Sequence, residues 1–306
     1  MTIVTRRLEE GHGQPGQHGQ HRRGPARGAT ARVARRAQGS PAAYAFLTVV
    51  LLASAFPLWW SFVIGSKDAA AINSGEVSLL PGGNFIENAR TVITTLPFWK
   101  AFGNSVIVST VVAVCVVLLS TLAGFAFAKL RFRGREGLLV FVIATMCVPT
   151  QLGVVPLFIV MAKLGWIGGL WAVILPAIVS AFGVFWMTQY LRESLPDELV
   201  EAARVDGAST LRIFWSVALP AARPGAAMLG LFTFIYTWTN FFWPFIVLEP
   251  GNPTLPVALQ QLQAAYYVDY SLVLAGVVLA AIPLLIVFVF AGRQLVSGIM
   301  QGAVKG

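Results

Sequence analysis

The stretch Glu201-Ala-Ala-Arg-Val-Asp-Gly207, followed by a second amphipathic run that ends at Leu219-Pro220, is the most informative part of the sequence. It is polar, helix-forming and divided by a glycine, and it lies between two long apolar stretches. In a chain this apolar, a polar segment of this kind is expected only where the segment contacts another protein in water. The segment therefore predicts a helical projection from a membrane-embedded chain.

The composition is that of a membrane protein. Hydrophobic residues make up 57% of the 306 residues and charged residues 11%, whereas soluble domains carry about 25% charged residues. Cys115 and Cys147 lie inside apolar stretches, and all three histidines lie in the N-terminal tail. We therefore expect an all-α, polytopic membrane protein that has no disulfide framework and no metal site and is not an enzyme.

Six apolar stretches are each long enough to cross about 30 Å of hydrocarbon. They define a predicted transmembrane domain over residues 43–293, followed by a cytoplasmic tail at 294–306. Residues 1–42 contain eight arginines and almost no large apolar side chains, which predicts a disordered basic tail with no nucleic-acid role. The predicted spans are 43–64, 104–128, 138–162, 168–190, 224–248 and 271–292.

The basic residues predict the orientation of the six spans. With both termini in the cytoplasm, 18 of the 22 Lys and Arg residues lie on the cytoplasmic side, as the positive-inside rule requires. Beyond the basic tail, these are Lys129, Arg131, Arg133, Arg135, Arg192, Arg204, Arg212, Arg223, Arg293 and Lys305. Only Lys67, Arg90, Lys100 and Lys163 fall outside.

The polar loop over residues 191–223 is predicted to contain two helices. Pro196 suits the first turn of a helix over about 196–206, and Gly207 ends that helix where a left-handed residue is needed. Ser209 is expected to cap the second helix, and Pro220 is expected to stop it. The alternative is an ordinary amphipathic loop on the membrane surface, although such loops are usually richer in Lys and Arg.

The spacing Glu-Ala-Ala, three residues, Gly, nine residues, Val-x-Leu-Pro resembles the cytoplasmic coupling loop of ABC importer permeases. Further stretches resemble the maltose-type, carbohydrate-importing members: Asn104-Ser105, Trp238–Pro244, Thr254–Leu259 and Gly302–Gly306. One position departs from the family pattern, which usually has Asn and then an acidic residue after the tryptophan of span five. Here Thr239 and Asn240 follow Trp238, so no charge-dependent role is carried over.

The resemblance implies a type I permease fold in the bacterial plasma membrane, surrounded by lipid and paired with a second, related permease chain. An extracytoplasmic solute-binding protein delivers the solute, and cytoplasmic ATPase subunits bind the ATP. The chain itself is expected to hold no cofactor, since it has no Gly-x4-Gly-Lys-Ser/Thr loop. The implied ATPase contacts are Glu201, Ala202, Ala203, Asp206, Gly207, Val217, Leu219 and Pro220, with Gly302, Lys305 and Gly306 of the tail.

The function that follows is ATP-driven import of a sugar or oligosaccharide. Tyr236, Thr237 and Asn240 are candidates for the solute pathway, where they could donate hydrogen bonds to hydroxyl groups, although polar residues in a bundle also join helices to each other. Three alternatives stay open: import of another polar solute, an ion-coupled secondary carrier, and a membrane scaffold without transport. A carrier would be expected to show buried carboxylates or broken half-helices.

The distribution of basic residues makes the orientation testable. Reporter fusions after Arg135 and after Arg212 are expected to read cytoplasmic, and fusions near Asn84 and Gly251 are expected to read external. An external signal at Arg212 would contradict the scheme, because the polar loop could not then meet a cytoplasmic ATPase.

Overall fold

The computed structural model describes residues 41–73, 78–264 and 268–303, and the side chains among them apart from residues 73 and 291–303. The chain divides into two units, residues 1–55 and 56–306. The described part of the first unit belongs to helix α2 (Pro41–Gly65), so the helix begins two residues before the predicted span. The rest of the predicted basic tail lies outside the described residues.

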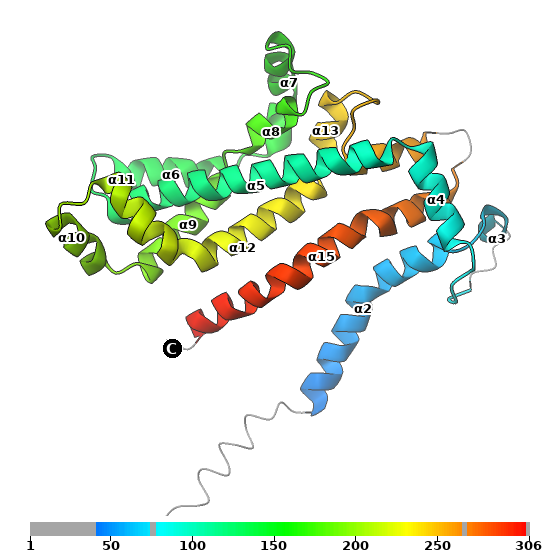
Figure 1. Ribbon diagram of the computed structural model, residues 1–306, viewed down its shortest axis with the longest axis horizontal. Coiled ribbons are helices and arrows are strands. Elements are labelled where there is room, and N and C mark those ends of the chain that lie inside the picture. Colours follow the sequence, from blue (N-terminus) through cyan, green and yellow to red (C-terminus); the bar gives the residue numbers. More distant parts are fainter. Residues whose placement is uncertain (1–40, 74–77, 265–267, 304–306) are drawn as a thin grey trace, which may run out of the picture. The chain divides into compact units, whose positions relative to one another are not determined.

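All regular secondary structure in the described part of the second unit is helical (Figure 1). Its elements are α3 (Ala69–Asn73), α4 (Phe85–Thr95), α5 (Phe98–Lys129), α6 (Arg135–Thr145), η1 (Thr150–Gly153), α7 (Val154–Lys163), α8 (Trp171–Ala177), α9 (Ala181–Ser194), α10 (Asp197–Val205), α11 (Thr210–Ile213), η2 (Phe214–Ala218), α12 (Leu219–Trp238), α13 (Phe242–Val247), α14 (Leu255–Gln260), η3 (Gln261–Gln263) and α15 (Tyr270–Ala303).

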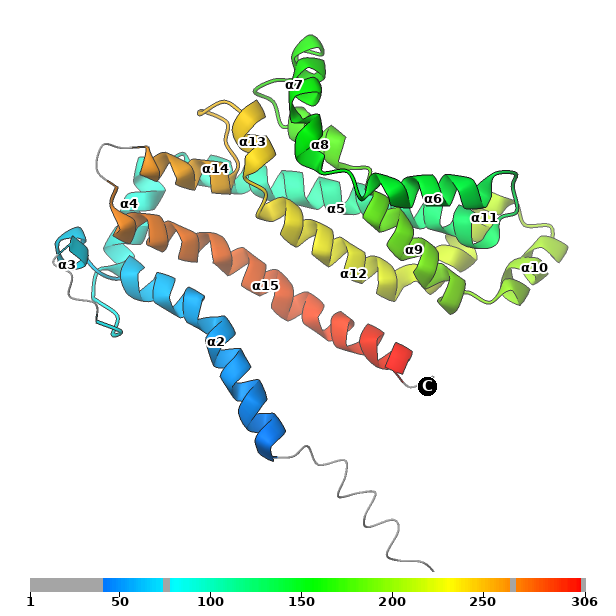
Figure 2. The same cartoon turned by 180° about the vertical axis from the view of Figure 1, so that it is seen from behind.

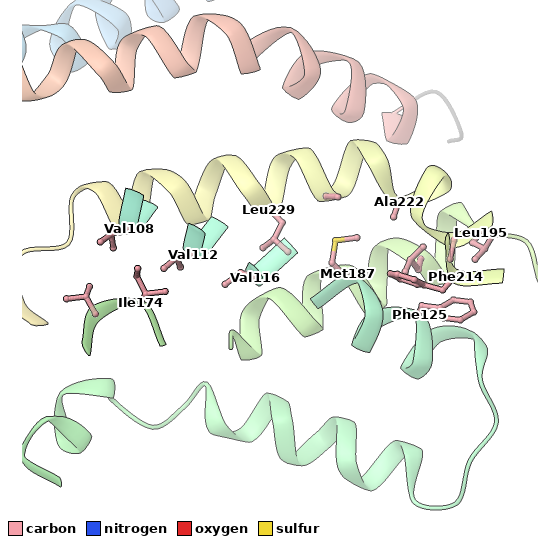
Figure 3. Close-up of a cluster of buried hydrophobic side chains, with 14 of the residues drawn as sticks. Val108, Val112, Val116, Phe125, Ile174, Met187, Leu195, Phe214, Ala222 and Leu229 are labelled. Atoms are coloured by element: carbon pink, nitrogen blue, oxygen red, sulfur yellow. The ribbon is translucent and has the colours of Figure 1, made fainter. Parts of the chain in front are cut away.

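Helices α5, α9 and α12 pack side by side and form the main core of this unit (Figures 1 and 2). Small residues let their backbones approach closely. A Cβ atom on Gly124 of α5 would lie 2.8 Å from the carbonyl carbon of Met187 on α9, and one on Gly225 of α12 would lie 2.6 Å from the Tyr190 ring. Buried apolar side chains fill the remaining space, from Val108 at one end to Phe125 at the other (Figure 3).

The described residues contain five helices long and apolar enough to cross a membrane, or six if one bent pair counts as a span. The number of predicted spans therefore agrees with the structure. The segment predicted as a span over 138–162 is sharply bent, because α6 and the η1–α7 segment meet at 87° (Figure 1). Pro149 explains the break, since a proline disfavours helical backbone at the residue before it.

The fifth span is also displaced from its predicted position at 224–248. The structure has one apolar helical run over Thr210–Trp238, then a break, and then the short helix α13. Helix α4, over Phe85–Thr95, lies in the segment between the first two spans.

Loops that were predicted to share the external side lie together in the structure. Asn104 Nδ2 donates to Asn252 Oδ1 at 3.0 Å and to the Pro253 carbonyl at 2.9 Å, and Asn252 Nδ2 donates to the Gly168 carbonyl at 2.9 Å. The Lys100 ammonium donates to the Gly251 carbonyl at 2.8 Å. These bonds join the start of α5 to the two loops at the same end of the bundle.

Candidate functional site

The candidate site is the projection formed by α10, α11, η2, the residues that join them and the start of α12 as far as Pro220, at one end of the α5–α9–α12 core (Figures 1 and 2). Its first helix is held by an ion pair. The Lys129 ammonium, on a side chain only 5% exposed at the end of α5, donates to Asp197 Oδ1 at 2.7 Å. This hydrogen bond and the charge of Lys129 hold the pKa of Asp197 below its ordinary value. Val200, also buried, anchors the same helix on the core.

The first helix ends in a Schellman motif at Gly207, whose φ is +77°. The Ala208 N–H donates to the Ala203 carbonyl at 3.0 Å, and the Gly207 N–H donates to the Arg204 carbonyl at 3.0 Å. These are the two bonds that define the motif. The predicted left-handed glycine is therefore confirmed, and the motif fixes the direction in which the chain leaves α10.

The predicted cap of the second helix is also present. Ser209 precedes α11, and its side chain accepts a hydrogen bond from the Arg212 N–H at 3.4 Å. The prediction that Pro220 stops this helix is wrong. The backbone continues through the π-helical turn η2, in which the Leu219 N–H donates to the Phe214 carbonyl five residues back. This wider turn relieves the clash that a proline ring makes in a regular helix, and Pro220 lies in the first turn of α12.

The structure divides the predicted ATPase contacts into two groups. Exposed residues of the projection are Glu201, Ala202, Asp206, Gly207 and Pro220. Ala203, Val217 and Leu219 are half-buried and pack against the core cluster. The second group therefore helps to fix the projection in place and leaves less surface for a partner.

Four apolar side chains of the projection are exposed and were not among the predicted contacts. They are Leu199, Val205, Leu211 and Trp215, with exposed fractions of 52%, 88%, 62% and 54%. Their neighbours Ile213 and Phe214 are buried, and the Phe214 ring lies 5.9 Å from that of Phe125. The four-residue spacing of Leu211 and Trp215, which places both on one helical face, was a signal in the sequence.

The three candidate pathway residues lie near the break after α12. Tyr236 is 69% exposed, and Thr237 and Asn240 are half-buried. Asn240 lies within the break itself, where its N–H donates to the Thr237 carbonyl at 3.2 Å. Of the predicted tail contacts, Gly302 lies in α15, whereas Lys305 and Gly306 lie outside the described residues.

A helical, multi-pass protein with this folded projection is a membrane permease in architecture. Residues 117–299 match the family described as "Binding-protein-dependent transport system inner membrane component". The chain therefore belongs to this family of inner-membrane permeases of ABC importers, which are transport proteins and not enzymes.

Relatives of known name cover most of the chain. The chain is 33% identical to arabinooligosaccharides transport system permease protein AraQ of Halalkalibacterium halodurans, over 86% of this chain and 94% of that protein. It is 32% identical to lactose transport system permease protein LacG of Rhizobium radiobacter, over 86% and 95%. It is 31% identical to sn-glycerol-3-phosphate transport system permease protein UgpE of Salmonella typhi, over 80% and 90%.

The fold is that of a solved importer chain. A chain in the crystal structure of a bacterial ABC transporter that imports the acidic polysaccharide alginate superimposes with a TM-score of 0.71, at 24% identity, covering 88% of this chain and 99% of that one. A chain from the same kind of transporter, in complex with a periplasmic protein bound to an alginate pentasaccharide, superimposes with a TM-score of 0.55 at 17% identity.

The Schellman motif leads to a test of the projection. Apart from the adjoining residues, no atom lies within 4 Å of the position that a Cβ would take at Gly207, so a side chain there is penalised only by the positive φ. Gly207→Val is expected to cost on the order of 1–3 kcal/mol locally and to reduce both transport and the amount of ATPase that co-purifies, while membrane insertion persists. Gly207→Asn is the matched control, because asparagine tolerates this backbone conformation. Glu201→Ala is expected to weaken the contact with the ATPase while disturbing the structure of the projection less.

Normal transport and a full complement of ATPase in Gly207→Val would show that the projection is not the coupling element. Equal losses of transport and of bound ATPase in Gly207→Val and Gly207→Asn would show that the ATPase contact needs the absence of a side chain at this position, and not its positive φ.

Proposed function

We propose that this permease imports a sugar or oligosaccharide and that the projection binds the ATPase subunit that drives import. The observation that carries the proposal is the contrast within the projection. Val200, Ile213 and Phe214 are buried in the core, whereas Val205 and Trp215 are exposed. An exposed tryptophan beside other exposed apolar residues, on a firmly held element, is typical of a surface that binds a protein partner.

The attachment of the projection suggests how the ATPase moves the spans. The ion pair between Lys129 and Asp197 ties α10 to the end of α5. On the other side of Gly207, α11 runs through η2 into α12 without interruption. A displacement of the projection would therefore reach both α5 and α12 as a rigid-body movement. ATP is bound by the separate ATPase, and this chain contributes the contact surface and the helices that transmit the movement.

The breaks at 146–149 and 239–241 are the proposed lining of the solute pathway. Regular helical geometry ends at both breaks, and non-helical backbone at membrane depth is tolerated where it lines a water-filled cavity or is covered by protein. The second break contains Asn240 and follows Tyr236 and Thr237. These side chains offer hydroxyl and amide groups, which suit the hydroxyl groups of a sugar.

Several relatives point to the same class of solute. AraQ and LacG carry the names of saccharide transport systems, and the solved importer takes alginate. UgpE is named for sn-glycerol-3-phosphate, so another polar solute is the second candidate. The three pathway residues are uncharged, whereas phosphate is usually bound by Arg or Lys. This favours a sugar over a phosphorylated solute.

The family name states that transport depends on a binding protein. We place that protein at the end of the bundle where the loops near Asn104, Gly168 and Asn252 are joined by hydrogen bonds. A second permease chain completes the pore, and exposed apolar residues such as Ile107 and Val114 of α5 are available to that chain and to lipid.

The test is uptake into proteoliposomes that hold the full chain together with the ATPase, second permease and binding protein of the same transporter. ATP-dependent uptake of lactose or arabino-oligosaccharide is expected, and uptake of sn-glycerol-3-phosphate is not. Tyr236→Phe removes one hydroxyl and is expected to raise the apparent KM about threefold to tenfold. Tyr270→Phe, an equally small change in an exposed tyrosine, is the control.

Uptake that follows an ion gradient without ATP would contradict the importer mechanism. ATP-dependent uptake of the phosphorylated solute alone would leave the importer intact and contradict the sugar assignment.

A further inference from the structure

Two adjoining hollows lie where α5 ends and α6 begins. The first has a volume of about 430 Å³ and is lined by Arg131, Phe132, Gly134, Arg135, Glu136 and Gly137. The second has a volume of about 270 Å³ and extends to Lys129 and Arg204. Arg131 and Arg135 line both hollows. We call the pair of hollows the basic site.

The charges of the basic site are incompletely neutralised. Within the second hollow, Lys129 is paired with Asp197 at 2.7 Å, and Glu201 is the other carboxylate. Among the residues that the structure describes, Arg131 and Arg204 form no ion pair. The site therefore has arginine side chains free to bind an anion.

Arg135 is held in a fixed orientation. Its guanidinium donates to Glu136 Oε1 through Nη2 at 2.8 Å and Nε at 3.2 Å, and through Nη1 to the Leu130 carbonyl at 3.2 Å. Its side chain is 30% exposed. A guanidinium that is already oriented loses little further freedom when it binds a phosphate or carboxylate oxygen.

An apolar surface begins directly beside these charges. Phe132 lines the first hollow and is 41% exposed. Leu138, Val140 and Phe141 on α6 follow, with exposed fractions of 49%, 65% and 65%. A ligand that carries an anionic head and a long apolar tail matches both surfaces at once, whereas a free anion matches only the first.

We propose that the basic site binds the phosphate of an anionic phospholipid, with the acyl chains lying along α6. Basic pockets at the cytoplasmic side of transmembrane helices are typical sites for such headgroups, and two hollows with shared arginines suit a lipid with two phosphates. The leaflet follows from the predicted orientation. Because Arg204 of α10 also lines the site, a bound lipid would contact the projection as well as the spans.

Native mass spectrometry of the purified full chain with added diphosphatidylglycerol, phosphatidylglycerol or phosphatidylcholine tests this proposal. The wild type is expected to retain the two anionic lipids and to lose phosphatidylcholine. Arg131→Gln with Arg135→Gln is expected to reduce retention about tenfold or more. Arg133→Gln is the matched control, since it makes the same charge change in the same loop but lines neither hollow.

The double variant could lower lipid retention by disturbing folding, because it removes the hydrogen bonds of Arg135. The single variant Arg131→Gln keeps those bonds and changes only an exposed side chain. It too is expected to lower lipid retention. Equal losses in Arg133→Gln would reveal a diffuse charge effect and overturn the proposal. So would retention of lipid by the double variant, binding of inorganic phosphate without lipid, or a loss of co-purified ATPase with lipid retention unchanged. The last result would assign the basic site to the ATPase.

Discussion

The close contact of α5 with α9 at Gly124 is the constraint on which the rest of the second unit depends. A Cβ atom there would meet the carbonyl carbon of Met187 at 2.8 Å and the backbone nitrogen of Thr188 at 2.9 Å. Because the two backbones touch, the last turn of α5 reaches the end of α9, and Lys129 can pair with Asp197. Without this contact α10 would lose its ion pair with α5, and a displacement of the projection would reach the core only through Val200 and α12.

Two connections with different physical character join the projection to the core. The ion pair to α5 is electrostatic, and its carboxylate is open to solvent. The link to α12 is covalent and helical, and it is reinforced by the Phe214 ring packed beside Phe125. The π-helical turn at Phe214–Ala218 lets that helix accept Pro220 without ending. Helix α12 therefore connects the surface proposed for the ATPase, at its first residues, with the break that contains Asn240, after its last residue.

Features that depend on neighbouring residues could be predicted from the sequence, whereas contacts between residues far apart in the chain could not. The left-handed Gly207 and the Ser209 cap depend on neighbouring residues, so their roles were predictable, as was the number of apolar spans. The pairing of Lys129 with Asp197 joins residues 68 apart in the sequence, and no periodic pattern indicates it. The passage of the helix through Pro220 was missed because a π-helical turn has no simple sequence signature. Pro149 indicates a bend in the span over 138–162, but the size of the bend, 87°, depends on packing and could not be predicted from the sequence.

In the proposed transporter, the projection binds the ATPase while the opposite end of the bundle binds the binding protein. Benzophenone attached to a cysteine at Val205 or at Leu80, which are 88% and 74% exposed, tests it in the assembled transporter after Cys115→Ser and Cys147→Ser. We expect a cross-link from Val205→Cys to the ATPase, and one from Leu80→Cys to the binding protein only. A cross-link from Leu80→Cys to the ATPase, or from Val205→Cys to lipid alone, would contradict it.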